Sequence, residues 1–190
     1  LHVAGYDRVA SRVTDALMEE GIAVNHDHDR LPDSIAALPS DSLLVVRTPA
    51  VPLEHPHHLT LAEKGARIIK RSELLGEIAD ETPTLAVAGT HGKTTTTAIL
   101  AHLLDGCPGK CNAFLGGIAT GVNSNLYLHE NAAWNVVEAD EFDRSFLHLH
   151  PAYAVITSLD ADHLDIYGDE ETFREAFQLF AQQVQKRILI

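Results

Sequence analysis

The 190-residue sequence is poor in positive charge, with 14 Lys and Arg against 27 Asp and Glu and a formal net charge of -13 at pH 7. Proteins that bind nucleic acids hold the phosphate backbone with clustered Lys and Arg, so no nucleic acid is expected as a partner. An anionic ligand would have to be bound by a local site. A phosphate-binding loop together with a metal ion would be such a site.

Long apolar runs and cysteines are also scarce. No apolar run approaches the roughly 18 residues of a membrane span, and no basic-then-apolar leader opens the sequence, so no membrane partner is expected and the expected location is the cytoplasm. The two cysteines, Cys107 and Cys111, would need histidines from elsewhere to form a zinc site. In a cytosolic chain a disulfide between them is not expected either. The 45% content of hydrophobic residues is sufficient for a folded core.

The stretch TLAVAGTHGKTTTTAIL, residues 84–100, carries the strongest signal. An apolar run, a loop with two glycines and a hydroxyl-rich segment at helical spacing predict a strand, a tight loop and the start of a helix. Gly89 and Gly92 let the backbone approach an anion, with the positive end of the helix behind it. Lys93 adds a mobile charge, and Thr94 offers a hydroxyl to the Mg²⁺ that accompanies a nucleoside triphosphate.

The loop departs from the general pattern G-x-x-x-x-G-K-[ST], because Val87 stands where the first glycine would fall. The segment GTHGKTT, residues 89–95, resembles the variant phosphate loop of the Mur ligase family, the ATP-dependent enzymes that join amino acids to the cell-wall precursor. A Gly/Thr-rich turn with a stray lysine is the alternative interpretation. The strand and the helix predicted on the correct sides argue against it.

Strands and helices alternate before the loop, which predicts a parallel sheet with helices on its faces. The expected elements are a strand at 1–7, a helix at 11–20, a strand at 22–25, a buried strand at 42–46, a helix at 56–64, a strand at 66–69 and a helix at 72–79. The polar segment 80–83 is the predicted domain boundary. The cluster His55-Pro56-His57-His58 is interpreted as a solvated helix start rather than as a metal site.

After the loop, the pattern predicts a helix through residue 104, a glycine-rich loop region over 106–121, strands at 134–137, 153–158 and 187–190, and a helix at 173–184. In an open parallel sheet the ligand crevice lies at the carboxyl ends of the strands, where Lys93, Glu138 and His163 follow three strands. Thr94 and Glu138 supply the oxygen ligands that Mg²⁺ prefers. The chemistry of His163 leaves open whether it is a ligand, a phosphate contact or a cap, since imidazole suits softer metals. The acidic run 138–143 also has an interpretation as a solvated loop.

Motifs over most of the chain resemble the Mur ligase family, and most of all its members that join L-alanine to UDP-N-acetylmuramate. They are AGTHGKTTTT at 88–97, VEADE at 137–141, DADHLD at 160–165 with Tyr167, FLGG at 114–117, and the turn TPAV at 48–51. The resemblance implies an α/β fold: a partial Rossmann-like UDP-sugar-binding domain at 1–80, then part of a P-loop-containing, mostly parallel central ATPase domain at 83–190. The C-terminal domain of the family is expected to be absent, and exposed sheet edges are expected to permit self-association.

The resemblance also implies a reaction, in which ATP phosphorylates the muramyl carboxylate and the amine of alanine attacks the acyl phosphate. The implied small-molecule partners are UDP-N-acetylmuramate, L-alanine and ATP, with Mg²⁺. The implied catalytic residues are Lys93, Glu138 and His163, and the implied metal ligands are Thr94, Glu138 and His163. The implied nucleotide-binding residues are Gly89, Thr90, His91, Gly92, Lys93, Thr94 and Thr95, and the implied substrate-binding residues are Thr48, Pro49, Ala50, His91 and Asn123.

Two alternatives share these motifs. One is a sister ligase that attaches a recycled peptide to the same UDP-sugar, and the other is a fragment that binds nucleotide without catalysis. The sequence gives less support to a P-loop kinase or a GTPase, because the loop spacing is wrong at Val87 and no guanine-recognition segment is present.

Overall fold

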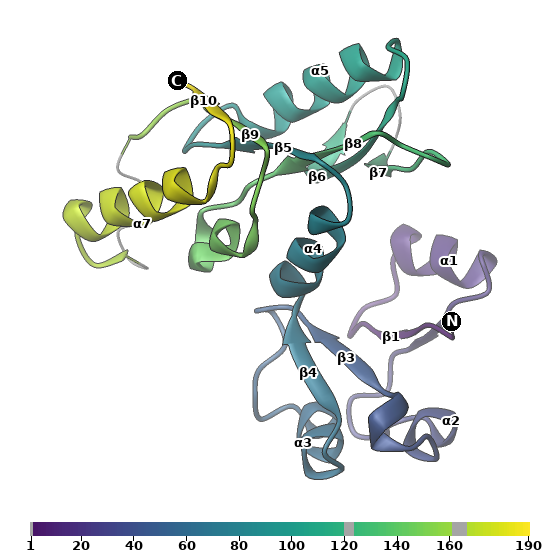
Figure 1. The fold of residues 1–190 in the computed structure, drawn as a ribbon. Coiled ribbons are helices and arrows are strands. Elements are labelled where there is room, and N and C mark those ends of the chain that lie inside the picture. The colour runs from purple at the N-terminus through teal and green to yellow at the C-terminus, as the bar shows by residue number, and fades with distance from the viewer. Residues whose placement is uncertain (1, 120–123, 161–166) are drawn as a thin grey trace. The chain divides into compact units, whose positions relative to one another are not determined.

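The computed structural model describes residues 2–119, 124–160 and 167–190 of the chain (Figure 1). The chain forms two compact units, residues 1–71 and residues 72–190. The α/β fold class predicted from the alternating pattern is confirmed in both units, because parallel strand pairs are joined through helices in each.

The first unit contains two separate pairs of parallel strands. Its elements are β1 (Ala4–Tyr6), α1 (Arg12–Glu19), β2 (Ala23–Asn25), α2 (Asp33–Ala36), the 3₁₀ turn η1 (Ser40–Ser42), β3 (Leu44–Arg47), α3 (Pro56–Glu63) and β4 (Arg67–Lys70). β1 pairs with β2, and β3 pairs with β4. The strand at 42–46 was expected to be buried, but Leu44 and Val46 of β3 are exposed.

Local sequence signals set the helix starts in this unit. The hydroxyl of Ser11 accepts a hydrogen bond from the backbone N–H of Thr14, which caps α1. Pro56 occupies the first turn of α3, where its missing N–H costs nothing. The Nδ1 atom of His55 accepts a hydrogen bond from the N–H of His57 and so caps α3.

The predicted helix start at residues 55–58 is confirmed, but its predicted solvation is wrong. His55 and His57 are each only 7% exposed. The ring of His55 lies against those of Tyr6, His28 and His57, with centroids 4.6–4.9 Å apart, and Tyr6 also contacts His57. Tyr6 and His28 are far from His55 in the sequence, and their rings help to bury a helix start that the local pattern placed in solvent.

The second unit contains a six-stranded sheet. Its elements are α4 (Arg71–Asp80), β5 (Thr84–Ala88), α5 (Lys93–Asp105), β6 (Cys111–Ala119), β7 (Ser124–Tyr127), β8 (Trp134–Glu138), the 3₁₀ segment η2 (Phe142–His148), β9 (Tyr153–Ile156), α7 (Glu170–Gln183) and β10 (Arg187–Leu189). The strand order is β10-β9-β5-β8-β6-β7, and all neighbours are parallel except β6 and β7.

The glycine-rich region was predicted as loops, and this expectation is wrong for residues 111–119. They form the long strand β6, which pairs parallel with β8 and antiparallel with β7. The alternating inward side chains Cys111, Ala113 and Leu115 are buried. Burial of one face of the strand compensates for the low strand propensity of Gly116 and Gly117. This burial depends on tertiary packing, so a local sequence pattern cannot predict it.

Helices cover both faces of this sheet, with α5 on one side and α7 on the other (Figure 1). On the face covered by α5, Ala101 of this helix packs against Val136 and the inward side chains of β6. On the opposite face, a cluster of aromatic side chains from α7 and η2 packs against the strands. It contains Phe146, Phe173, Phe177 and Phe180. Because β5 and β8 are buried on both faces, their order and the position of their carboxyl ends are firmly fixed.

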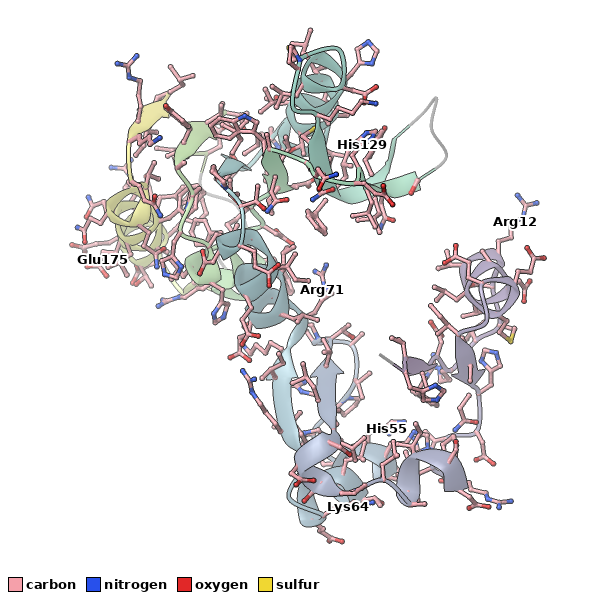
Figure 2. All side chains as sticks on the ribbon, turned by 45° about the vertical axis from the view of Figure 1, so that its right-hand side comes forward. Arg12, His55, Lys64, Arg71, His129 and Glu175 are labelled. Carbon is pink, nitrogen blue, oxygen red and sulfur yellow. The ribbon has the colours of Figure 1, made fainter. Side chains whose placement is uncertain are left out.

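The helix α4 belongs to the second unit. The contacts divide the chain after Arg71, whereas the sequence predicts the boundary at the polar break 80–83. Ala79 is 2% exposed within the aromatic cluster, and a Cβ on Gly76 would lie 2.3 Å from the carbonyl oxygen of His148. This packing holds α4 to the second unit. Figure 2 labels Arg71 at its start.

Candidate functional site

The candidate site begins with the loop between β5 and α5. Gly89 has a φ of +126°, and a Cβ there would lie 2.3 Å from Oγ1 of Thr157. Gly92 has a φ of +80° and is the N-terminal cap residue of α5. Among the described residues no side chain caps this helix end. The predicted strand, glycine loop and helix start are therefore present, with the backbone N–H groups of the first helical turn available to an anion.

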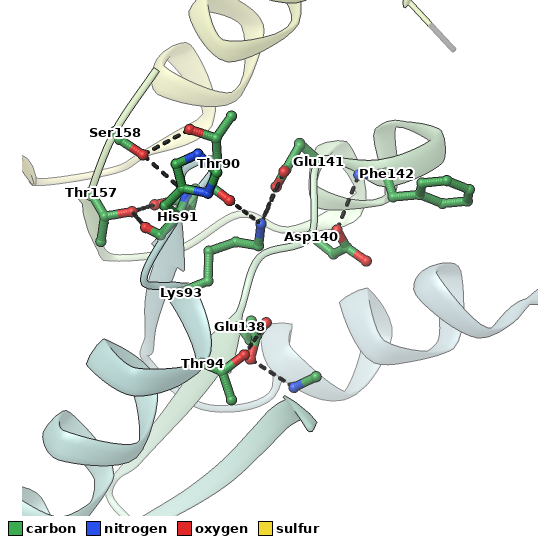
Figure 3. Close-up of polar contacts among 12 residues, drawn as sticks. Thr90, His91, Lys93, Thr94, Glu138, Asp140, Glu141, Phe142, Thr157 and Ser158 are labelled. Carbon is green, nitrogen blue, oxygen red and sulfur yellow. Dashed lines mark hydrogen bonds and ion pairs between the residues drawn. The ribbon is translucent and has the colours of Figure 1, made fainter. Parts of the chain in front are cut away.

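Residues that follow β9 hold the loop in place (Figure 3). The N–H of Thr90 donates to the carbonyl oxygen of Ser158 at 3.2 Å, and the two hydroxyl groups of these residues lie 2.7 Å apart. The N–H of His91 donates to Oγ of Ser158 at 3.0 Å. The hydroxyl of Thr157 lies 3.2 Å and 2.5 Å from the carbonyl oxygens of Ala88 and His91. The end of β9 thus fixes the loop that starts at the end of β5.

Lys93 is ion-paired with a buried carboxylate. Its Nζ lies 2.9 Å and 2.8 Å from the two carboxylate oxygens of Glu141, and 3.5 Å from the carbonyl oxygen of Thr90. The side chain of Glu141 is 0% exposed and that of Lys93 is 14% exposed. In Figure 3 the lysine side chain extends from the start of α5 toward the segment after β8. The acidic run 138–143 is therefore not a solvated loop at Glu141.

Glu138, at the end of β8, faces the first turn of α5. Its Oε1 accepts a hydrogen bond from the hydroxyl of Thr94 at 2.9 Å, and its Oε2 accepts one from the N–H of Gly116 at 2.7 Å. A Cβ on Gly116 would lie 2.6 Å from Oε1 of Glu138. The predicted pair of Thr94 and Glu138 is thus brought together. Two oxygen atoms beside a phosphate-type loop fit the preference of Mg²⁺ for oxygen ligands.

Two predicted residues cannot be placed. His163 and Asn123 lie outside the described residues. Among the residues that are described, no group of three or more His, Cys, Asp or Glu side chains could hold a metal ion. The oxygen pair of Thr94 and Glu138 is therefore the part of the predicted metal site that the described chain provides.

The remaining predicted residues lie in two places. Thr95 and His91 are exposed at the loop and helix start of the second unit. Thr48, Pro49 and Ala50 form a turn after β3 in the first unit. The guanidinium of Arg47 donates to the carbonyl oxygen of Val51 at 3.0 Å across this turn. The turn is thus a fixed feature of the first unit, with Pro49 and Ala50 exposed.

Sequence reasoning missed three residues of the site: Glu141, Gly116 and Ser158. Glu141 stood in a recognised acidic run, but nothing local distinguished its side chain from Asp140 or Asp143. Gly116 stood in a recognised glycine pair that was assigned to a loop. Only the pairing of β6 with β8 places its N–H against Glu138.

Tyr167 connects the site to the aromatic cluster. Its hydroxyl donates to the backbone carbonyl oxygen of Glu141 at 2.5 Å, and its ring contacts Phe173. Burial, followed by the negative charge of Glu141, raises the pKa of Tyr167 to about 12. The phenol therefore stays protonated and keeps donating this hydrogen bond throughout the physiological pH range.

Among known protein families, the Mur ligase middle domain matches residues 87–190 of this chain. Curated relatives with the name UDP-N-acetylmuramate–L-alanine ligase include those of Porphyromonas gingivalis and Christiangramia forsetii. Each is 50% identical, over 186 and 184 residues respectively, which is 97% and 96% of this chain. The chain spans 40% of the length of each of these relatives.

Two solved ligase structures are similar to this chain over nearly its whole length. The UDP-N-acetylmuramate–alanine ligase MurC of Thermotoga maritima matches with a TM-score of 0.82 and 29% identity, over 99% of this chain and 43% of that one. The UDP-N-acetylmuramate:L-alanyl-gamma-D-glutamyl-meso-diaminopimelate ligase of Neisseria meningitides matches with a TM-score of 0.81 and 26% identity, over 96% of this chain and 60% of that one.

No helix in the described part of the chain is both long enough and apolar enough to span a membrane.

Proposed function

The chain belongs to the Mur ligase family, and on this basis we propose that it carries the nucleotide-binding centre of an ATP-dependent ligase that joins L-alanine to UDP-N-acetylmuramate. The observation that carries the proposal is the contact of Thr94 with Glu138 at the start of α5, directly after Lys93 and the glycine loop. The 50% identity to relatives named for this reaction supports the choice of substrates. The setting proposed for this activity is cell-wall precursor synthesis in the cytoplasm.

In this proposal the loop binds the phosphates of ATP. Gly92 leaves open space beside the backbone, Gly89 lets Thr157 and Ser158 pack against the loop, and the N–H groups at the start of α5 donate to phosphate oxygens. The ammonium group of Lys93 balances negative charge on the transferred phosphoryl group, as an electrostatic rather than a covalent catalyst. Thr90 and His91 shape the loop through their contacts with Ser158.

Thr94 and Glu138 would hold the Mg²⁺ that accompanies ATP, and His163 is proposed as a further ligand from the family resemblance alone. When bound, Mg²⁺ would supply charge neutralisation on the phosphates. Gly116 orients the carboxylate of Glu138 by donating its N–H to Oε2. Thr95 is proposed to contact the nucleotide, and Thr48, Pro49, Ala50, His91 and Asn123 are proposed to contact the UDP-sugar.

A second candidate is the sister ligase that attaches a recycled peptide to the same UDP-sugar. The Neisseria structure, with a TM-score of 0.81, favours keeping it. Both reactions would use the same phosphate loop. Phosphate release by the complete protein, with UDP-N-acetylmuramate and either L-alanine or the tripeptide named in that structure's title, would separate the two candidates. Release that depends on L-alanine supports the first.

The binding step can be tested on this chain by isothermal titration with Mg-ATP and with UDP-N-acetylmuramate, beside a phosphate-release assay with L-alanine. Substitution of Lys93 by Ala is expected to abolish Mg-ATP binding, since it removes the cation at the loop. A circular dichroism spectrum of each variant controls for folding. Unchanged nucleotide affinity in a folded Lys93→Ala variant would refute the assignment of the loop. Binding without phosphate release would favour a nucleotide-binding fragment over an enzyme.

A further inference from the structure

We infer that Glu141 is a positioning residue for Lys93, and that the phosphates of a bound nucleotide compete with its carboxylate for the lysine ammonium group. The inference rests on the proposed function, because it assigns a control element to the same phosphate loop. It concerns a residue that the resemblance did not assign.

The first argument is the geometry of the ion pair. The Nζ of Lys93 lies within 2.9 Å of both carboxylate oxygens of Glu141 and 3.5 Å from the carbonyl oxygen of Thr90. An ammonium group has three N–H donors. Two of them are hydrogen-bonded within the protein, to Oε1 of Glu141 and to the carbonyl oxygen of Thr90, and the second carboxylate oxygen lies 2.8 Å from Nζ. A phosphate that draws the ammonium group toward itself must therefore compete with the carboxylate for it.

The second argument is burial. The carboxylate of Glu141 is 0% exposed, and in Figure 3 Lys93 lies between it and the loop. A buried carboxylate is retained only where a cation or strong donors compensate for its lost hydration. Glu141 thus fixes the position of the lysine head group more tightly than the backbone carbonyl of Thr90 could by itself.

The third argument is that the backbone around Glu141 is held rigidly. Its carbonyl oxygen accepts hydrogen bonds from the hydroxyl of Tyr167 at 2.5 Å and from the N–H of Arg144 at 3.0 Å. Asp143 and Arg144 both have left-handed backbone conformations, with φ of 52° and 55°. Non-glycine residues adopt this conformation only where surrounding contacts impose it. The backbone that carries the Glu141 side chain is therefore held in position by the surrounding structure.

These features set the direction of the effect on ligand binding. The carboxylate partly neutralises the charge that the loop offers, and as a like charge it opposes a polyphosphate. Glu141→Gln keeps the shape and an acceptor oxygen but removes the charge. It is expected to bind Mg-ATP about tenfold more tightly than the unchanged chain, which corresponds to about 1.4 kcal/mol.

The test is isothermal titration of the chain with Mg-ATP and with Mg-ADP. Glu130→Gln is the control, since it removes the same charge from an exposed position in the loop between β7 and β8. Glu130→Gln is expected to leave both affinities unchanged within twofold. Equal or weaker Mg-ATP binding by a folded Glu141→Gln variant, while the unchanged chain binds, would overturn the inference and leave the proposed function standing.

A second measurement needs no nucleotide. Lys93→Met is expected to lower the melting temperature, because it leaves the buried carboxylate without its cation, and Lys93→Met combined with Glu141→Gln is expected to recover most of this loss. A double variant that melts no higher than Lys93→Met would overturn the positioning role. Failure of both the unchanged chain and Glu141→Gln to bind Mg-ATP would instead refute the proposed function, and the competition with it.

Discussion

The two units differ in what they bury. In the second unit, apolar side chains on both faces of a six-stranded sheet form two clusters, and the largest consists mainly of phenylalanines, alanines and aliphatic residues. In the described part of the first unit, Leu61 is the only buried apolar side chain, and the other buried side chains are Thr14, His55 and His57. Several apolar side chains of the first unit are exposed, among them Val13, Leu44, Leu53 and Leu59.

This difference explains where the candidate site can be built. Side chains such as Lys93, Glu138 and Glu141 keep a fixed geometry only on elements that are themselves fixed by packing. β5 and β8 meet this condition, because their residues are buried on both faces of the sheet. The first unit, with little apolar burial, is expected to be the less stable of the two.

The largest expected effect concerns the aromatic cluster. Phe173→Ala should lower the free energy of unfolding of the second unit by about 3–5 kcal/mol, because the side chain is 0% exposed and leaves a cavity. Urea unfolding followed by the fluorescence of Trp134, the single tryptophan of the chain, measures this. Leu179→Ala is the control on the same helix, since Leu179 is 48% exposed and should change stability by only about 0.5 kcal/mol. Equal effects at both positions would contradict the assigned core.

A smaller effect is expected from Gly116→Ala, which should cost about 1–3 kcal/mol and weaken Mg-ATP binding. The added methyl group would lie 2.6 Å from Oε1 of Glu138 and push the carboxylate away from Thr94. The neighbouring Gly117→Ala is the matched control, because its methyl group would meet only Cγ2 of Thr94, at 3.8 Å. Titration with ATP at several magnesium concentrations separates them. If both variants bind alike, the Gly116 contact does not orient Glu138.

A local effect is expected in the first unit from Ser11→Ala, which removes the hydroxyl that caps α1. The loss should be about 1 kcal/mol. Hydrogen exchange followed by mass spectrometry should show faster exchange in residues 12–19 and unchanged exchange in β5. Ser11→Asn keeps an acceptor and should restore the protection. Faster exchange throughout both units would show that they unfold together, against the division after Arg71.

The smallest expected effect is a pH dependence confined to the first unit. Burial lowers the pKa of His55 below the ordinary value of a histidine, about 6.5, and the nearby His57, His28 and His58 lower it further while Asp29 raises it. Since His55 takes up a proton more readily in the unfolded chain, the free energy of unfolding is unaffected above pH 6.5. It then falls as the pH drops, until the folded-state pKa is passed.

Hydrogen exchange of β1 and α3 at pH 7.5 and pH 5.5, corrected for intrinsic rates, measures this loss. His55→Gln should reduce the difference between the two pH values, whereas His26→Gln, at an exposed histidine whose Nδ1 lies 2.7 Å from the carbonyl oxygen of Asp7, should not. A loss of protection in β5 as large as that in β1 would place the acid-sensitive group in the second unit instead.

Local patterns were sufficient for the elements that carry the site. The strand, glycine loop and helix of residues 84–105 follow from a continuous stretch, and so does the acidic end of β8 at Glu138. The helix α7 was predicted from its phenylalanine spacing and begins at its Asp169 cap, slightly earlier than the first periodic residue. In each case, the residues that define the element are neighbours in the sequence. Their local pattern was therefore enough to predict the element.

The sequence by itself therefore determined the fold class, the glycine loop between β5 and α5, and the meeting of Thr94 with Glu138 at the carboxyl ends of the strands. Only the tertiary structure decided that Glu141 holds Lys93 from 48 positions away, that Gly116 lies in a strand against Glu138, and that His55 and His57 are buried. The physical reason is that burial and ion pairing depend on which distant segments meet. A local pattern predicts whether a segment forms a strand or a helix, but it does not determine which distant segments pack against it.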